Sequence, residues 1–399
     1  MILIEAAIVV LAIVTGALCV PAVVLFAECL AAVLPARRAQ PPADAPRPSL
    51  GILVPAHNES AVIDRTLRSL REQLNAGDRL VVIADNCTDD TAEIARRHEA
   101  EVIVRENREL RGKGYALTAG LAALLDRPTE VVVVIDADCT LEPGCLDALG
   151  HSVARSGRPM QGCYLMPPPA NPRPIDVVSA LAVLIKNKVR PLGCRRMGLP
   201  CLLTGSGAAF PMQILTATSF AGSHIVEDMQ LAVDLALAGQ APRFCPEAVL
   251  SASLPDRESA FITQRTRWEH GHLQTLFSQG PRLLAGFLRT GKIDCAALML
   301  DLCVPPLSLL AMVSLAVFAG TVALGAATAD WSLAALMLLN GGLMGLAVAL
   351  AWARFGRAQF PLTTLLAVPW YVLVKIPLYA GFLYRRQTAW VRTRRNSQS

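Results

Sequence analysis

Two aspartates that follow a run of apolar residues are the first candidates for chemistry. Residues 131 to 138 read Val-Val-Val-Val-Ile-Asp-Ala-Asp, and such an apolar run is typical of a strand buried on both faces, as in a parallel sheet. On extended backbone, Asp136 and Asp138 would point to the same side. Two close carboxylates repel each other unless a cation lies between them, and hard divalent cations prefer oxygen ligands. We interpret the pair as a site for Mg²⁺ or Mn²⁺; the alternative is that it only opens a turn into Pro143-Gly144.

Polar residues also follow the other apolar segments of this region. Pro55, His57 and Glu59 come after one such segment, and Asp85 comes after the next. Lys113 stands between two glycines at the start of an expected helix, a position that suits a phosphate. Because the carboxyl ends of the strands hold the ligands of open α/β sheets, we expect these residues at one edge of a sheet. Each cluster alone could also be a turn or a helix cap.

A second acidic pair and a polar triplet occur later in the chain. Glu227 and Asp228 open a predicted helix, where acidic residues can also simply match the helix dipole. Gln264, Arg267 and Trp268 lie at positions i, i+3 and i+4 of another predicted helix. That spacing places the three side chains on one face of the helix.

The spacing of apolar residues predicts the elements that must position these side chains. Strands are expected at 50–54, 80–84, 102–104 and 131–135, and helices at 60–74, 90–98 and 113–125. This alternation favours a doubly wound α/β sheet. An apolar stretch at 175–190 is expected to form either a helix at the membrane interface or a core helix.

The chain is divided between charged and nearly uncharged parts. Of its 399 residues 53% are hydrophobic, and the mean hydropathy is +0.43. Segments long enough to cross a bilayer are predicted at 6–27, 304–325, 331–353 and 362–384. We therefore expect five parts, which are a transmembrane segment at 1–34, a linker at 35–48, a soluble domain at 49–290, apolar segments at 296–385 and a basic tail at 386–399.

The positions of the arginines predict orientation and partners. Arg37 and Arg38 follow the first apolar segment, so the soluble domain is expected in the cytoplasm, in a multi-pass protein of the inner (cell) membrane. If the last apolar segment spans the membrane fully, the basic tail lies outside the cell, although positive residues favour the cytoplasmic side. Either this segment is re-entrant or interfacial, or it is an exception to that rule. The net charge of +5, with arginines beside apolar segments, favours membrane lipids over nucleic acid. The 11 scattered cysteines are expected to be reduced thiols.

Taken in order, these motifs resemble those of the membrane-bound family 2 glycosyltransferases, which include cellulose, hyaluronan and poly-N-acetylglucosamine synthases. The resemblance covers roughly residues 48 to 280 and is carried above all by Gln264-x-x-Arg267-Trp268. It implies an α/β GT-A fold with flanking transmembrane helices. It also implies inverting transfer from a nucleotide sugar, most often a UDP-sugar, to a growing polysaccharide or glycan. The alternative is transfer of a single sugar to a lipid or lipid-linked acceptor.

The resemblance also implies a role for each motif. Residues holding the donor are Pro55, His57, Glu59, Asp85, Lys113 and Asp136, with Asp138 nearest the metal ion. Asp228 is the expected catalytic base, and the diphosphate and acceptor group comprises Glu227, Gln264, Arg267 and Trp268. One departure is that Asn86 follows Asp85 where Asp-Asp is common, which leaves the nucleobase preference open.

The chemistry of the residues agrees with this assignment. The leaving diphosphate requires neutralisation, which a metal ion with lysine and arginine can provide. Inversion requires one base near the acceptor and no nucleophile from the enzyme. A transporter or receptor with a nucleotide-binding domain is the rival class, but the chain has no Gly-x-x-x-x-Gly-Lys-Ser/Thr loop.

Overall fold

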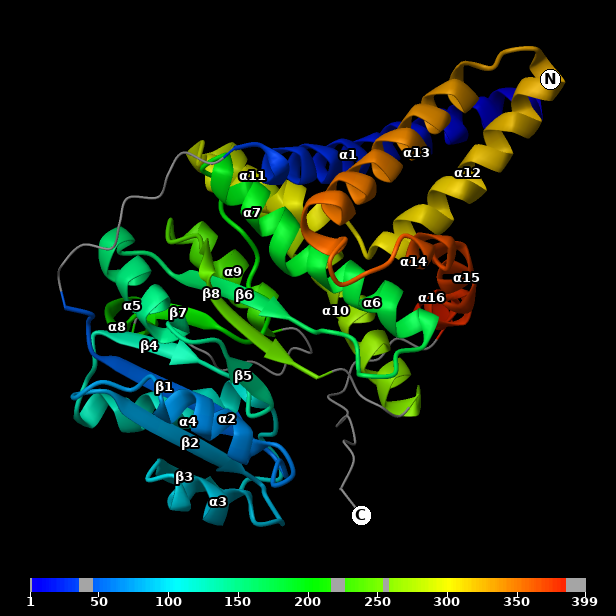
Figure 1. The fold of residues 1–399 in the computed structure, drawn as a ribbon. Coiled ribbons are helices and arrows are strands. Elements are labelled where there is room, and N and C mark those ends of the chain that lie inside the picture. The colour runs from blue at the N-terminus through cyan, green and yellow to red at the C-terminus, as the bar shows by residue number, and fades with distance from the viewer. Residues whose placement is uncertain (1, 36–45, 217–226, 254–257, 385–399) are drawn as a thin grey trace.

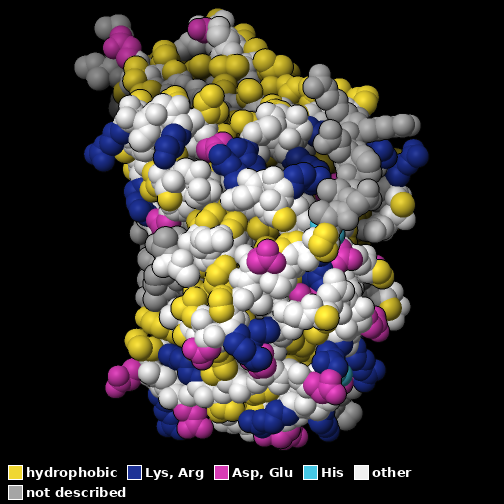
Figure 2. All heavy atoms as spheres, turned by 90° about the vertical axis from the view of Figure 1, so that its left-hand side faces the viewer, with side chains coloured by type: hydrophobic (Ala, Val, Ile, Leu, Met, Phe, Trp, Pro, Cys, Tyr) yellow, Lys and Arg dark blue, Asp and Glu magenta, His cyan; other side chains and the backbone are white. Residues whose placement is uncertain are grey.

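The computed structural model describes residues 2–35, 46–216, 227–253 and 258–384. A sheet covered by helices forms one end of the molecule, and three long apolar helices, α1, α12 and α13, run together at the other end (Figure 1). Figure 2 shows hydrophobic side chains gathered over the helical end and charges of both signs over the sheet. The separation predicted from the sequence is therefore present in the fold.

The sheet has eight strands in the order β3-β2-β1-β4-β7-β6-β8-β5. The strands are β1 (Leu50–Ala56), β2 (Arg79–Asp85), β3 (Glu101–Arg105), β4 (Val131–Val134), β5 (Cys139–Leu141), β6 (Met160–Leu165), β7 (Ala208–Pro211) and β8 (Arg243–Ala252). The first four are parallel, as predicted, but β7 runs antiparallel to β4. The expectation of a parallel sheet around the central strand was wrong on that side, because β7 comes from a segment in which no strand was predicted.

Helices cover both faces of the sheet. They are α2 (Ile63–Arg71), α3 (Thr91–Arg97), α4 (Lys113–Asp126), α5 (Cys145–Ser156), α8 (Met212–Thr216) and α9 (Glu227–Leu237). Val131 and Val133 of β4 are buried in one cluster with residues of α2 and α5. Val132 and Val134 are buried in a second cluster with residues of α4 and α9. The apolar run is thus explained by a strand that is buried on both faces.

Five further elements join the sheet to the apolar helices. They are α6 (Pro174–Leu184), the π-helical turn η1 (Ile185–Val189), α7 (Arg190–Arg196), α10 (Glu258–Thr290) and α11 (Ile293–Cys303). The stretch predicted at 175–190 comprises α6 and η1, and residues such as Leu181 and Ile185 lie in the same buried cluster as β1. Of the two alternatives for this stretch, the structure supports the core helix.

Among the residues that the structure describes, three helices are long and apolar enough to cross a membrane: α1 (Ile2–Val33), α12 (Leu307–Thr328), and α13 (Ser332–Ala351) continued by the π-helical turn η2 (Trp352–Gly356). The last apolar segment instead forms α14 (Thr363–Leu366), α15 (Val368–Val374) and α16 (Ile376–Tyr384). Proline is the second residue of both α15 and α16, where its missing N–H and its restriction of the preceding residue favour a break. The segment is therefore not one continuous helix, which agrees with the re-entrant or interfacial alternative.

Candidate active site

The aspartate pair lies at the end of the central strand. Because β4 ends at Val134, both aspartates lie in the turn before β5 and not on extended backbone as predicted. Their carboxylates still converge, since ligand atoms of Asp136, Asp138 and Cys139 all lie within 4.8 Å of one another. Burial, together with the charges of Asp138 and Asp136, raises the pKa of the Cys139 thiol well above its usual range. The two carboxylates offer the oxygen ligands that a hard divalent ion such as Mg²⁺ or Mn²⁺ prefers.

Lys113 lies beside this pair at the first position of α4. Its ammonium forms an ion pair with Asp136 and donates a hydrogen bond to the Gly205 carbonyl at 2.6 Å. The Ser206 hydroxyl oxygen accepts a hydrogen bond from the Asp136 backbone N–H at 3.0 Å. A loop around Gly205 therefore meets the end of β4 and the start of α4 at one point.

The two loops predicted to hold the nucleoside lie next to each other. A ring nitrogen of His57 lies 2.6 Å from the Asp85 carbonyl oxygen, and the Asp85 carboxylate accepts a hydrogen bond from Arg105 at 2.5 Å. Asn58 and Asn86 have φ angles of 55° and 52°, a region that asparagine enters more readily than most residues. This backbone conformation is compatible with either asparagine or aspartate, so it does not explain the asparagine at position 86.

Asp228 lies on the opposite side of the Gly205 loop, at the second position of α9. A Cβ atom built on Gly205 would lie 3.5 Å from Oδ2 of Asp228 and 3.9 Å from Oδ2 of Asp136. Burial raises the pKa of Asp228, while Lys113 and Lys186 oppose this shift. Asp228 is therefore more basic than an exposed aspartate. The side chain of Glu227 lies outside the described residues.

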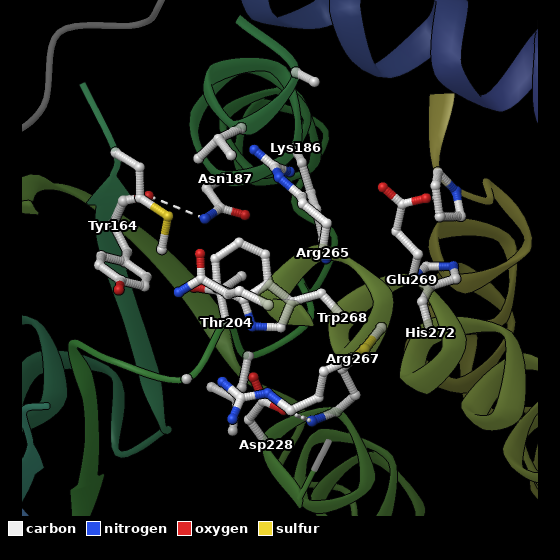
Figure 3. A pocket seen from close by; sticks show the side chains of 18 of the residues that line it. Tyr164, Lys186, Asn187, Thr204, Asp228, Arg265, Arg267, Trp268, Glu269 and His272 are labelled. Atoms are coloured by element: carbon white, nitrogen blue, oxygen red, sulfur yellow. Dashed lines mark hydrogen bonds between the residues drawn. The ribbon is translucent and has the colours of Figure 1, made fainter. Parts of the chain in front are cut away.

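Helix α10 carries the predicted triplet along one side of the same space. Gln264, Arg267 and Trp268 all line one cavity with the residues of the strand ends. Gln264 is only 5% exposed, and its side-chain oxygen has no hydrogen-bond partner among the described residues. Figure 3 shows Arg267 and Asp228 on one side of the Trp268 ring. The structure brings together all of the predicted site residues whose side chains it describes.

Several cations that were not predicted as site residues also line this cavity, among them Lys186 and Arg265. Lys186 extends into it from η1, and Arg265 lies over the Trp268 ring, with its guanidinium carbon 5.4 Å from the ring centre. Figure 3 shows both cations on the side of Trp268 opposite Asp228. Val178, Ala182 and Lys186 line the cavity at helical spacing, so the side that Lys186 faces follows from which face of this helix borders the cavity.

The cavity has a volume of about 1780 Å³ and extends well beyond the strand ends. It continues past Lys186 and Arg265 to residues of α12, α13 and α15, such as Phe318, Gly345 and Tyr371. A carboxylate-lined site at a sheet edge is thus continuous with a space between apolar helices.

The sheet domain has a fold of the GT-A type. Residues 46–271 match the family described as Glycosyltransferase like family 2, and the chain belongs to that family. A probable glycosyltransferase, YdaM, of Bacillus subtilis is 25% identical over 252 residues, or 56% of this chain and 55% of that protein. An N-acetylglucosaminyltransferase of Rhizobium leguminosarum is 25% identical over 240 residues, with the same coverage of 56% and 55%. The chain spans about half the length of these relatives.

One solved structure is similar along nearly the whole chain. It is the mannosyltransferase PcManGT from Pyrobaculum calidifontis, in complex with GDP-Man and Mn²⁺. It is 21% identical, has a TM-score of 0.58, and covers 96% of this chain and 100% of that one. This likeness concerns the fold, including the arrangement of the apolar helices with the sheet domain.

Proposed function

We propose that this protein is a metal-dependent, inverting glycosyltransferase that moves a sugar from a nucleotide sugar to a hydroxyl group of an acceptor held at the membrane. The observation that carries the proposal is the single cavity that runs from Asp136, Asp138 and Asp228 to the apolar helices. The names of the relatives support sugar transfer, and the sequence motifs favour a UDP-sugar as donor.

The donor would bind at the ends of β1, β2 and β4. Pro55, His57, Glu59 and Asp85 line this part of the cavity and would hold the nucleoside. Asp138, with Asp136, would hold Mg²⁺ or Mn²⁺, which neutralises the leaving diphosphate when it is bound. Lys113 and Arg267 would add positive charge on either side of the same group. Because Lys113 pairs with Asp136 in the structure, its ammonium is already fixed at the place where the diphosphate charge would develop.

Asp228 would act as the base for the acceptor. An acceptor hydroxyl oxygen attacks the anomeric carbon from the face opposite the diphosphate, and its proton passes to the Asp228 carboxylate. The bond between the anomeric carbon and the phosphate oxygen breaks, and the nucleoside diphosphate leaves with that electron pair. The raised pKa of Asp228 suits this step, because a carboxylate of higher pKa is a stronger base.

The membrane end of the cavity favours a lipid or lipid-linked acceptor over a polysaccharide chain. Gly341, Gly342 and Gly345 of α13 line the cavity, and no atom lies within 4 Å of a Cβ atom built on any of them. Glycines spaced in this way often allow two helices to pack closely, but here they leave open space along an apolar wall. An alkyl chain fits such a space, whereas a polysaccharide would need polar groups along it.

The sheet domain would face the cytoplasm. Arg37 and Arg38 follow the first apolar helix in the sequence, and Arg282, Arg289 and Lys292 precede the α12 and α13 pair. Positive residues beside membrane helices favour the cytoplasmic side. The protein would then be an inner (cell) membrane enzyme with its donor site where nucleotide sugars are made.

The test is sugar transfer by the purified full chain in lipid vesicles. Labelled UDP- and GDP-sugars are supplied with a lipid extract, and the label is followed into the organic phase and into polymer. We expect organic-phase product of low mass. Asp228→Asn should lower turnover by about 10²–10⁴-fold, the usual effect of a general base, with donor affinity nearly unchanged. The exposed residue Asp90 gives the control variant Asp90→Asn. Normal turnover by Asp228→Asn would move the role to Glu227.

A further inference from the structure

Two cations in the membrane-side half of the cavity, Arg190 and Lys375, are neutralised by carboxylates of the protein. Arg190 pairs with Glu28 and Asp301, and Lys375 pairs with Glu269. The Lys186 ammonium, in contrast, makes no hydrogen bond or ion pair with any residue that the structure describes. Arg265 lies near enough to affect the charge of Lys186, and one of its contacts is a hydrogen bond that it donates to the Ser179 carbonyl at 3.3 Å.

Lys186 is held in an unfavourable position for a charge. Protein surrounds it, although its side chain is exposed to the cavity, and burial lowers its pKa. Asp228 favours the charged form, whereas Arg190 and Arg265 disfavour it. A cation enclosed in this way is costly unless it meets an anion. An anion entering the cavity would therefore be attracted to Lys186 and Arg265 together.

The position of this pair along the cavity limits what the anion can belong to. Trp268 separates Lys186 and Arg265 from Asp228 (Figure 3). The η1 turn that carries Lys186 packs against α1 and α13, two of the helices that could cross a membrane. The anion would therefore lie between a group stacked on Trp268 and a chain lying in the apolar space along α13.

We propose that Lys186 and Arg265 form a phosphate-binding subsite for the acceptor, and that the acceptor is a saccharide joined to a lipid through phosphate. The inference rests on the proposed function and specifies its acceptor. The lipid chain lies along the glycines of α13, the phosphate lies between Lys186 and Arg265, and the sugar lies on Trp268 with a hydroxyl group at Asp228. Arginine and lysine are the residues that proteins use most to bind phosphate, and an indole ring offers a flat apolar face to a sugar.

The experiment measures binding without requiring sugar transfer. Purified full-length protein in nanodiscs is titrated with hexadecyl phosphate, with hexadecyl glucoside and with inorganic phosphate, and separately with a nucleoside diphosphate and Mn²⁺. Hexadecyl phosphate should bind more tightly than both other probes, since only it offers a phosphate and an alkyl chain. Lys186→Met should lower the affinity for hexadecyl phosphate about 10- to 100-fold, the usual effect of losing a charge-assisted hydrogen bond. Lys186→Arg should retain most of the affinity.

Lys188 provides a matched control on the same turn. Lys188→Met removes an identical charge two residues away, at a position that does not line the cavity. An equal loss of affinity for hexadecyl phosphate in both methionine variants would overturn the proposal, because it would show that the probe responds to the overall positive charge and not to Lys186. Competition between hexadecyl phosphate and the nucleoside diphosphate would also overturn it, since the cations would then belong to the donor site. Equal affinity for inorganic phosphate would indicate a free anion as the ligand.

The binding experiment can fail or succeed independently of the test of sugar transfer. If no nucleotide sugar supports transfer but hexadecyl phosphate binding depends on Lys186, the subsite stands and the reaction is wrong. If transfer to lipid occurs but Lys186→Met and Lys188→Met have the same acceptor KM, the reaction stands and the phosphate subsite is wrong.

Discussion

The two kinds of acidic residue in the cavity differ in their surroundings. Asp136 is ion-paired with Lys113, whereas Asp228 is partly buried, has a pKa raised by desolvation, and accepts a hydrogen bond from the Met229 N–H at 2.9 Å. A carboxylate neutralised by a cation is a poor base, while a desolvated carboxylate is a better one. This contrast, more than position along the chain, supports Asp228 as the base and the aspartate pair as the metal ligands.

Asp138 provides the test of the metal site. It is 8% exposed and lies beside Asp136, so Asp138→Ala should remove a ligand without changing the surface of the fold. We expect Mn²⁺ to strengthen nucleoside diphosphate binding in the parent protein and to have little effect in Asp138→Ala. The loss should be at least about 10- to 100-fold in affinity, measured by titration with and without a chelator. The control is Asp126→Ala at the exposed end of α4. Metal-dependent binding that survives in Asp138→Ala would contradict the assignment.

At the level of helices, buried ion pairs join the apolar helices to the sheet domain. Arg190 of α7 forms an ion pair with Glu28 of α1, with an N–O distance of 2.5 Å, and another with Asp301 of α11. On the other side, Glu269 of α10 pairs with Lys375 between α15 and α16. Protein encloses both groups of ion pairs. Glu28 and Lys375 each lie in a segment whose other residues are mostly apolar. These pairs account for Glu28 and Lys375, which would be costly in lipid.

Arg190 should therefore be important for stability. Arg190→Met leaves two carboxylates buried without a partner, and removing one member of a buried pair typically costs about 3–5 kcal/mol. We expect a clearly lower Tm in detergent. Arg195→Met is the control, since Arg195 pairs with Glu247 at 2.8 Å near the surface, where an ion pair contributes about 1 kcal/mol or less. Adding Glu28→Gln and Asp301→Asn to Arg190→Met should recover part of the loss, and equal Tm values for the two single variants would refute this account.

The glycines of α13 test the proposed path of the acceptor. Gly345→Leu places a side chain in open space that belongs to the cavity. If an alkyl chain occupies that space, the KM for the lipid acceptor should rise about tenfold or more, while nucleotide binding should not change. Gly16→Leu is the matched control, because Gly16 of α1 also has no atom within 4 Å of a Cβ atom but does not line the cavity. An unchanged acceptor KM in Gly345→Leu would exclude this path.

At the level of the whole molecule, the apolar helices predict a defined orientation. The turn between α12 and α13 contains the exposed Asp330, and Glu93 is exposed on α3 of the sheet domain. With a cytoplasmic sheet domain, Asp330→Cys should react with a membrane-impermeant thiol reagent in intact cells, and Glu93→Cys should react only after permeabilisation. The parent protein gives the background, since most of its cysteines are buried. Labelling of Glu93→Cys in intact cells would reverse the orientation.

The sequence by itself determined the local elements and the order of the motifs. Buried strands, amphipathic helices and membrane-length apolar segments leave periodic or compositional patterns in neighbouring residues. The strand at 131–134, the helix that starts with Lys113 and the long apolar helices were predicted for this reason, and strand ends meet at one sheet edge whenever the strands are parallel. The donor half of the candidate site could therefore be assembled from the sequence.

Only the tertiary structure decided which distant segments meet. The pairing of β7 with β4, the contact of Arg190 with Glu28, and the opening of the cavity along α13 all join residues far apart in the chain. In the sequence, Lys186 is one of several cations at the end of an apolar helix, and only the packing of that helix brings it into the cavity. Such contacts depend on packing between elements, and packing leaves no pattern in the residues next to any one of them.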